Sequence, residues 1–142
     1  MTERHDSVIL HFVVRVFMVP FIFVFGIYVL IHGEASPGGG FQAGAIVASS
    51  IVLGRLTLGN DHSEYRFPTR LLIWLSSLGL GIYLVTGIIP RLFGGNYLDY
   101  NVLAHDPVHG QHLGILIIEF GVGLTVASVM ISIFYYFAGR GR

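Results

Sequence analysis

Four long apolar runs take up most of this chain of 142 residues. A transmembrane helix needs about 20 mostly apolar residues, because the hydrocarbon core of a bilayer is about 30 Å thick and a helix rises about 1.5 Å per residue. The runs predict four transmembrane helices, at about residues 8–31, 41–58, 71–93 and 113–137. We therefore expect an all-α membrane protein in which residues 1–142 form one integral membrane domain.

The charge composition excludes several other classes of protein. Only 11% of the residues are charged and 54% are hydrophobic, which is far too apolar for a soluble domain. Eight basic residues balance eight acidic ones, so no basic excess is available to hold a nucleic acid. The chain has no Cys, and we find no hydrolytic triad, phosphate-binding loop, dinucleotide fingerprint or paired carboxylates. The sequence therefore predicts no cofactor and no enzyme activity.

The first apolar run could be interpreted as a cleaved signal peptide. It is longer than the apolar part of such peptides, which spans about 7–15 residues, and it lacks a small-x-small cleavage site. We therefore expect a retained transmembrane helix. Pro20 lies inside this helix, where it removes a backbone donor and clashes with the preceding turn, so a kink is predicted there.

Arginine positions predict the orientation, because basic residues near helix ends are retained on the cytoplasmic side. Six of the eight arginines flank the N-terminus, the second connection or the C-terminus: Arg4, Arg55, Arg66, Arg70, Arg140 and Arg142. The other two connections, 33–40 and 94–111, have only Arg91 near them, just before the second of the two. We therefore expect both termini in the cytoplasm and these two connections outside, in a multi-pass protein of the cell membrane.

Small residues at helical spacing predict where the helices pack, because membrane helices associate by close contact rather than by hydrophobic burial. Through the start of the second helix, a small residue recurs at every fourth position: Ser36, Gly40, Gly44 and Ala48. The third and fourth helices contain shorter patterns of this kind: Ser77–Gly81, Gly121–Thr125 and Gly123–Ala127. The second helix is therefore expected to be the most tightly enclosed.

A proline and three glycines connect the first two helices. Pro37 ends the first segment, and the run Gly38, Gly39, Gly40 can adopt backbone conformations that other residues rarely adopt. A phosphate-binding loop would also need a Lys followed by Ser or Thr, which this run lacks. We expect a tight hairpin whose backbone approaches another helix, with Phe41 and Gly44 on the same packing surface.

Glu119 is the acidic residue that lies deepest in an apolar run. The predicted helix start places it about seven residues, or roughly 10 Å, inside the outer boundary. His112 lies two turns earlier on the same face. An ionisable residue at membrane depth costs at least about 2.5 kcal/mol and usually has a purpose. Glu119 is either a neutral, hydrogen-bonded packing residue or a group that handles cations or protons.

Arg15 lies about seven residues into the first helix from its cytoplasmic end. Its long side chain can extend to the interface and anchor the helix there. Alternatively, it is a buried cation that fixes the protonation of a carboxylate on a neighbouring subunit. A direct pair with Glu119 is not expected, because the two residues lie toward opposite faces of the membrane.

Several histidines lie near the predicted outer face. One group offers ligand types that zinc accepts: His105, Asp106, His109 and His112. His32 and His112 could also serve as the two axial ligands of a haem, which would make the chain an electron-transfer subunit. Neither spacing establishes converging ligands, and the sequence predicts no metal site.

Two segments resemble a known family. Pro37–Gly44 (PGGGFQAG) follows His32-Gly33 at the end of the first helix, and Ile117–Val122 (IIEFGV) follows His112. Both are similar to the B subunit (MnhB/MrpB type) of multisubunit cation/proton antiporters, whose relatives also occur in membrane-bound hydrogenases and related respiratory complexes. The length and the four-helix layout agree over essentially the whole chain. Many members have a second His where this chain has Glu34, which keeps a polar group at the mouth, and Gly where it has Ala43.

The resemblance implies a non-catalytic subunit of a complex in the prokaryotic inner membrane that exchanges cytoplasmic Na+ for external protons. In such complexes the exchange chemistry is associated with larger antiporter-like subunits that have a membrane-embedded Lys, and this chain has no Lys. The implied partners are those subunits, Na+, protons and lipid. The candidate residues of an ion pathway are Glu119, His112, Glu34 and Arg15. The alternative is the equivalent subunit of an ion-pumping, hydrogenase-type respiratory complex.

Overall fold

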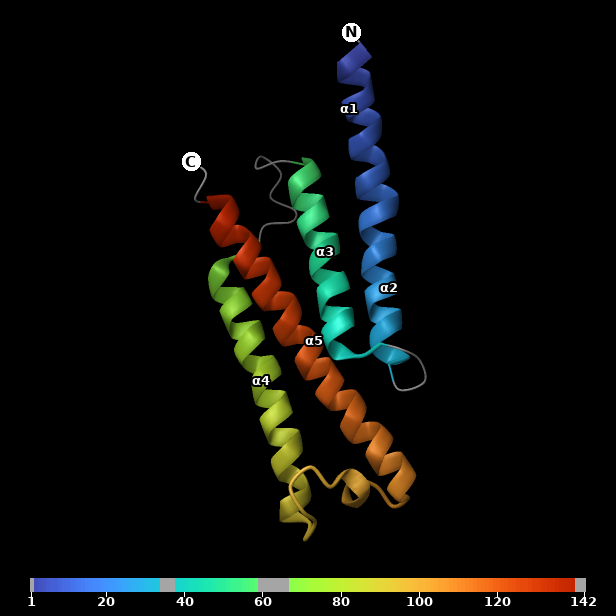
Figure 1. Ribbon diagram of the computed structural model, residues 1–142, viewed down its shortest axis with the longest axis vertical. Helices are drawn as coiled ribbons and strands as arrows, with labels where there is room; N and C mark the ends of the chain where they lie inside the picture. Colours follow the sequence, from blue (N-terminus) through green and yellow to red (C-terminus); the bar gives the residue numbers. More distant parts are fainter. Residues whose placement is uncertain (1, 34–37, 59–66, 140–142) are drawn as a thin grey trace.

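The computed structural model describes the backbone of residues 2–33, 38–58 and 67–139, most of which is helical (Figure 1). One continuous rod contains α1 (Thr2–Val13), the π-helical segment η1 (Val14–Met18) and α2 (Val19–Ile31). The remaining elements are α3 (Gly40–Leu58), α4 (Thr69–Leu92), the short 3-10 helix η3 (Tyr100–Leu103) and α5 (Pro107–Gly139). Within these residues, 4 helices are long and apolar enough to cross a membrane, which confirms the all-α membrane prediction.

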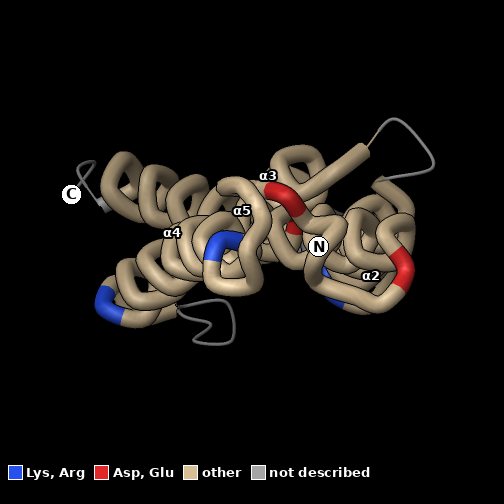
Figure 2. The backbone as a smooth tube through the Cα atoms, turned by 90° about the horizontal axis from the view of Figure 1, so that it is seen from below, with Lys and Arg blue, Asp and Glu red and all other residues tan. Residues whose placement is uncertain are grey.

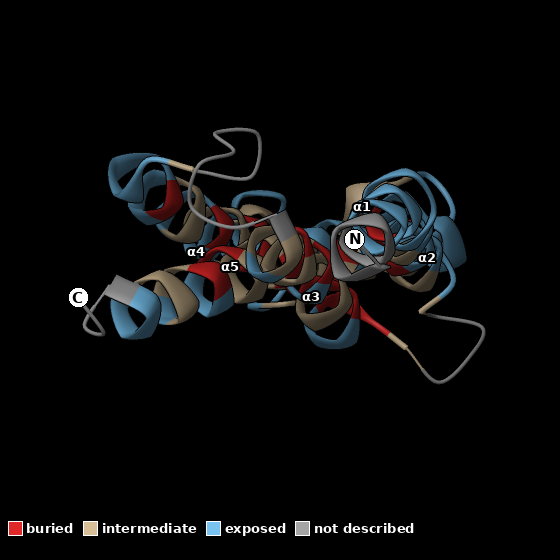
Figure 3. Cartoon of the chain, turned by 90° about the horizontal axis from the view of Figure 1, so that it is seen from above, coloured by how far each residue is buried: buried red, intermediate tan, exposed pale blue. Residues whose placement is uncertain are grey.

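The helices form a row rather than a closed bundle (Figure 3). Along this row the order is α2, α3, α5, α4, because α3 packs against α2 and α5, whereas α4 packs against α5. Many large apolar side chains are exposed, among them Trp74 at 74% and Leu92 at 79%. Since a row has two broad faces, lipid or other membrane proteins must cover most of this apolar surface.

The π-helical segment η1 directly precedes Pro20. Proline has no N–H group, and its ring clashes with the carbonyl four residues earlier. The chain accommodates this by widening one turn, so that the N–H of Val19 donates to the oxygen of Val14, five residues back. The disturbance predicted at Pro20 is thus a π-helical turn within an unbroken rod.

The last helix is longer than the apolar run indicated. It begins at Pro107 rather than near residue 113, so the preceding connection is shorter than predicted. The residues before Leu113 include two histidines and a glutamine, which a search for apolar runs omits, although a helix can contain them. As a result Glu119 lies twelve residues from the helix start, about 18 Å along the axis, rather than about seven residues.

The first turn of α3 lies beside the middle of α4 and α5 rather than at their ends. Gly40, the first residue of α3, packs against Gly123 of α5. On the adjoining face of α5, Gly121 packs against Gly79, the eleventh of the 24 residues of α4. The start of α3 is therefore level with the middle of α4, as Figure 1 shows.

The other half of α3 shows the same offset. Ala48, near the middle of α3, clusters with Leu72 of the first turn of α4 and with Ile131 of α5. The second half of α3 therefore extends beyond the start of α4. The helices α3 and α4 are offset along their axes by about half of the length of α3. A bilayer core about 30 Å thick therefore cannot be centred on both helices.

The start of α1 and the end of α5 lie at the same end of the molecule (Figure 1). Charged positions are sparse along the chain (Figure 2). The orientation that places this end in the cytoplasm stays a prediction from the arginine positions.

Candidate functional site

Glycines bring α3 and α5 into backbone contact. A Cβ added at Gly40 would overlap the backbone carbonyl oxygen of Glu119. A Cβ added at Gly44, one turn further along α3, would lie 2.5 Å from the backbone oxygen of Gly123 and 2.9 Å from the Cβ of Val126. Real Cβ atoms essentially never approach other atoms within 3.0 Å. The two helices can therefore cross at this distance only because neither position has a side chain.

The Glu119 carboxylate lies against the hairpin between α2 and α3. Its Oε2 atom is 2.7 Å from the place that a Cβ at Gly33 would occupy, and its Oε1 atom is 3.2 Å from the corresponding place at Gly39. The residue is half-buried. Because α3 begins at Gly40, the carboxylate lies beside the positive end of the α3 dipole, where an anion is stabilised by about 0.3–1 kcal/mol.

The two ends of the hairpin touch each other. A Cβ at Gly33 would lie 2.8 Å from the Cα of Gly39, and Gly39 has a φ of +131°, which L side chains rarely adopt. Glycine is therefore required at Gly39 for its conformation and at Gly33 for space. Residues 34–37 lie outside the described residues, and with them the predicted roles of Glu34 and Pro37.

Other residues expected at the hairpin differ in their surroundings. Gly38 lies beside α2, where an added Cβ would be 3.2 Å from Cγ1 of Val29. Phe41, expected on the same packing surface as Gly44, is 63% exposed. Within this chain the contact is therefore formed by glycine backbone and not by the Phe41 ring.

The contact between α4 and α5 uses a glycine that spacing did not single out. A Cβ added at Gly79 would overlap both Oγ1 of Thr125 and the backbone oxygen of Gly121. The Thr125 hydroxyl also lies 3.2 Å from the backbone oxygen of Ser76, to which it donates a hydrogen bond. This is an interhelical hydrogen bond of the kind that supplements close packing in membranes.

The pattern Ser77–Gly81 indicated the wrong face of α4. Ser77 is exposed, and a Cβ added at Gly81 would meet no heavy atom of the described chain within 4 Å outside its own helix turn. Gly79 and Gly81 are two residues apart and therefore about 200° apart around the helix. Spacing identifies a stripe of small residues, but it does not say which of two stripes meets the neighbouring helix.

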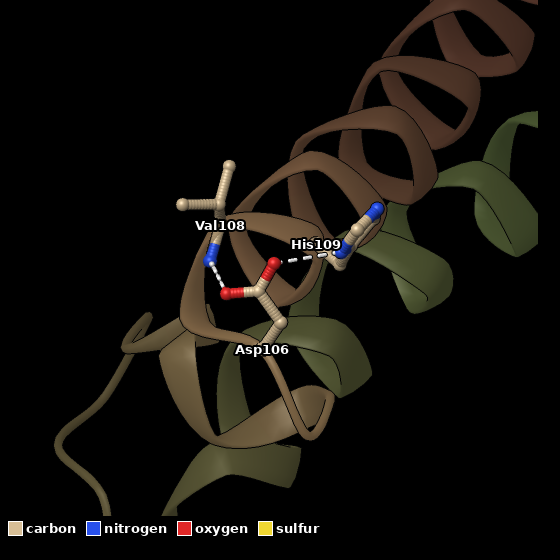
Figure 4. A network of polar contacts seen from close by, with 3 residues as sticks. All are labelled: Asp106, Val108 and His109. Carbon is tan, nitrogen blue, oxygen red and sulfur yellow. Dashed lines mark hydrogen bonds and ion pairs between the residues drawn. The ribbon is translucent and has the colours of Figure 1, made fainter.

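Asp106 holds the start of α5 (Figure 4). Its Oδ1 accepts a hydrogen bond of 3.3 Å from the N–H of Val108, and its Oδ2 lies 2.8 Å from Nδ1 of His109. Pro107 occupies the first position of the helix, where its missing N–H has no cost. Asp106 and His109 thus form a helix cap. Among the described residues no group of three or more His, Asp or Glu is arranged to hold a metal ion.

The two histidines considered as haem ligands lie on different helices. The ring of His32 stacks on Tyr28 with centroids 4.1 Å apart, and its Nδ1 is 3.1 Å from the backbone oxygen of Tyr28. These contacts hold the ring along α2. His112 is exposed on α5, and because this helix is continuous from Pro107, His112 and Glu119 lie two turns apart on one helix.

Arg15 lies in the π-helical segment η1 and is exposed. It precedes Gly33 by eighteen residues on one unbroken rod, a separation of about 27 Å. Since Glu119 lies beside Gly33, Arg15 and Glu119 are separated by about 27 Å along this rod.

Tyr100 fastens the connection between α4 and α5. A Cβ added at Gly114 would overlap the Tyr100 ring, so η3 packs directly on α5. Burial raises the pKa of the Tyr100 phenol above its usual value of 10.0, and negative charge on the neighbouring phenols of Tyr83 and Tyr97 raises it further. The buried phenol is therefore neutral at physiological pH.

These features define a small polytopic membrane protein whose helices join through glycine contacts and leave two broad apolar faces uncovered. The chain belongs to the family described as "Domain related to MnhB subunit of Na+/H+ antiporter", whose family model matches residues 9–132. It is therefore a subunit of an Mnh-type antiporter complex, as its resemblance to the B subunit indicated.

Curated relatives match along the whole chain. Proteins of Staphylococcus aureus strains Newman and JH1, each named "Putative antiporter subunit mnhB2", are 30% identical to it over 139 residues. These alignments cover 96% of this chain and 97% of each relative. The likeness therefore includes the hairpin and the Glu119 segment as well as the apolar runs.

Proposed function

We propose that this chain is a non-catalytic, multi-pass subunit of a complex in the prokaryotic cell membrane that exchanges Na+ for protons. Both of its termini lie in the cytoplasm. It packs beside the larger antiporter-like subunits and contributes Glu119 to the path of the ions. The chain itself supplies no Lys, so the coupled exchange takes place on its partners.

The position of Glu119 carries this proposal. Its carboxylate lies within a membrane-spanning helix and against the backbone of Gly33 and Gly39. Ionisable groups at such depth are costly and mark pathways for ions or protons. Glycine backbone allows a small cation to approach the carboxylate without a side chain in the way.

The other candidate residues have subordinate roles. His112 lies two turns from Glu119 on the same helix, and an imidazole can both accept and donate protons, so it can pass protons toward the carboxylate. Glu34 supplies a polar group at the mouth. Arg15 lies in η1, about 27 Å from Gly33 along the first rod, and anchors the helix at the cytoplasmic interface.

Replacing the carboxylate tests the proposal. Glu119→Gln keeps the size and hydrogen bonding of the side chain but removes its charge, and Glu119→Asp keeps the charge with a shorter reach. In vesicles containing the whole complex, we expect Glu119→Gln to lower the Na+/H+ exchange rate at least tenfold or to move its pH profile, and Glu119→Asp to have the smaller effect. The amount of assembled complex serves as the control for both variants.

A purely structural role gives a different result. If the Glu119→Gln complex assembles at the normal level and exchanges Na+ for protons at the native rate at every pH, the carboxylate is a packing residue and the proposed ion role is wrong.

A further inference from the structure

A small cavity lies between the start of α4 and the end of α5. Its volume is about 70 Å³, whereas one water molecule needs about 10–15 Å³. The residues that line it are Thr69, Leu72, Ser132, Tyr135 and Tyr136. Leu72 is 2% exposed and belongs to the apolar cluster with Ala48 and Ile131, so this side of the cavity is firmly packed. The cavity can therefore hold several waters or one compact polar group.

Four of the five lining side chains have a hydroxyl group. The Ser132 hydroxyl donates to the backbone of its own helix, and the Tyr135 oxygen accepts a hydrogen bond of 3.3 Å from the N–H of Phe67. Thr69 and Tyr136 are exposed, and a hydroxyl can donate to a ligand. None of the five lining residues is acidic. The lining therefore offers hydrogen-bond donors to an anion rather than carboxylates to a cation.

Two arginines lie near this cavity. The guanidinium carbon of Arg55, in the last turn of α3, is 5.9 Å from the centre of the Tyr135 ring. Arg70 follows Thr69 in the first turn of α4 and is exposed. Guanidinium groups match the geometry of phosphate and are always charged at physiological pH. Hydroxyl donors with two arginines nearby favour a phosphate group as the ligand.

Three apolar helices end at the level of this cavity. The apolar span of α4 begins at Thr69, and that of α5 ends at Ala138, close to the lining tyrosines. The span of α3 ends at Thr57, and Arg55 from its last turn reaches Tyr135. Helices leave the hydrocarbon core where their apolar spans end, and phospholipid headgroups lie at that depth. This argument concerns one end of each helix and does not depend on where the other ends lie.

We propose that this cavity binds the headgroup phosphate of an anionic phospholipid. The two arginines attract its charge, and its acyl chains lie along exposed apolar side chains next to the lining residues, such as Ile73 of α4 (55% exposed) and Ile133 of α5 (50% exposed). Free phosphate would gain nothing from this apolar surface. The inference goes beyond the proposed ion role of Glu119 and does not depend on it.

Photolabelling of the purified complex tests this proposal. A phosphatidylglycerol with a diazirine near its headgroup is expected to label peptides that contain residues 67–72 or 132–136, identified by mass spectrometry. Unlabelled phosphatidylglycerol should suppress this labelling, whereas phosphatidylcholine should do so less well and inorganic phosphate not at all. Suppression by inorganic phosphate would indicate a site for the free ion, and equal suppression by phosphatidylcholine would show that the arginines confer no preference. Either result, or no label in these peptides, would overturn the proposal.

Variants distinguish binding in the cavity from labelling of the nearby surface. Ser132→Leu fills the cavity, and Tyr136→Phe removes one exposed hydroxyl but keeps the ring. Tyr97→Phe is the matched control, because Tyr97 is also exposed but lies beside Gly87, near the other end of α4. Relative to the amount of assembled complex, we expect labelling to fall at least threefold with Ser132→Leu and at least twofold with Tyr136→Phe, and to stay unchanged with Tyr97→Phe.

Native labelling of the Ser132→Leu complex would contradict the proposed site. If Ser132→Leu prevents assembly, the conservative pair decides, and equal labelling of the Tyr136→Phe and Tyr97→Phe complexes would then contradict it. The exchange assay on Glu119→Gln does not bear on these results, so the two proposals can fail separately.

Discussion

The backbone of Gly40 lies directly against the backbone carbonyl of Glu119. No side chain separates α3 from α5 at this point, and the same turn of α5 carries its carboxylate to the hairpin at Gly33 and Gly39. One helix crossing therefore fixes both the position of the hairpin and the position of the only carboxylate in the described part of α5.

A methyl group at Gly40 should disrupt assembly, whereas one at Gly81 should not. Both are glycines in membrane helices, but only Gly40 contacts another helix backbone. Overpacking of this kind costs about 1–3 kcal/mol. We expect Gly40→Ala to lower the amount of purified complex at least threefold, Gly40→Leu to lower it further, and Gly81→Ala to leave it unchanged. Normal recovery and exchange with Gly40→Leu would show that the hairpin acts only as a connection.

Removing the cap at Asp106 should loosen the start of α5. Asp106→Ala loses the hydrogen bond from the N–H of Val108, and loss of a cap costs about 1 kcal/mol. Asp106→Asn keeps an acceptor and serves as the control. Hydrogen exchange at the amides of residues 108–111 is expected to accelerate about fivefold in Asp106→Ala, since about 1 kcal/mol is a factor of about five. Equal exchange in the two variants would argue that the cap contributes nothing.

The Tyr100 phenol should ionise only in strongly alkaline solution. Burial raises its pKa in the folded chain above 10.0, so its contribution to stability is complete below pH 10.0 and is lost as the pH rises through the raised value. Ultraviolet titration of the native chain and Tyr100→Phe should differ by one phenol that ionises above pH 10.0. The Tyr100→Phe chain should also lose less stability at alkaline pH. A difference spectrum with its midpoint at or below 10.0 would refute this assignment.

The chain should not exchange ions without its partners. It has one deep carboxylate and no Lys, whereas a coupled exchanger needs several titratable groups around a central site. Expressed alone in an antiporter-deficient strain, it is expected to give no Na+-driven proton movement in membrane vesicles above that of the empty vector. Recovery of exchange by the single chain would show that it is a transporter in its own right.

The sequence was sufficient for the number of helices and for the hairpin, because apolar length and glycine runs are local properties. It was insufficient for the start of α5, because His109 and His112 interrupt the apolar pattern while a cap at Asp106 extends the helix. It also pointed to Gly81 where the fold uses Gly79. Which face meets a neighbour depends on the position of another helix, and the sequence of one helix does not contain that information.

The offset between α3 and α4, about half of the length of α3, could not be predicted from the sequence for the same reason. It arises because Gly40 and Gly79 meet α5 at neighbouring turns, although Gly40 begins its helix and Gly79 lies in the middle of its own. A pattern of small residues specifies a surface for contact, and only the partner surface decides the height at which contact occurs.

The order of helices in the row differs from their order of synthesis. In the described residues α3 and α4 have almost no contact with each other, and α5 lies between them. When α4 leaves the ribosome, the first three membrane helices therefore consist of a joined pair and a separate single helix. Only the last helix to be translated unites them, so the layer is completed by an insertion at its centre and not by an addition at its edge.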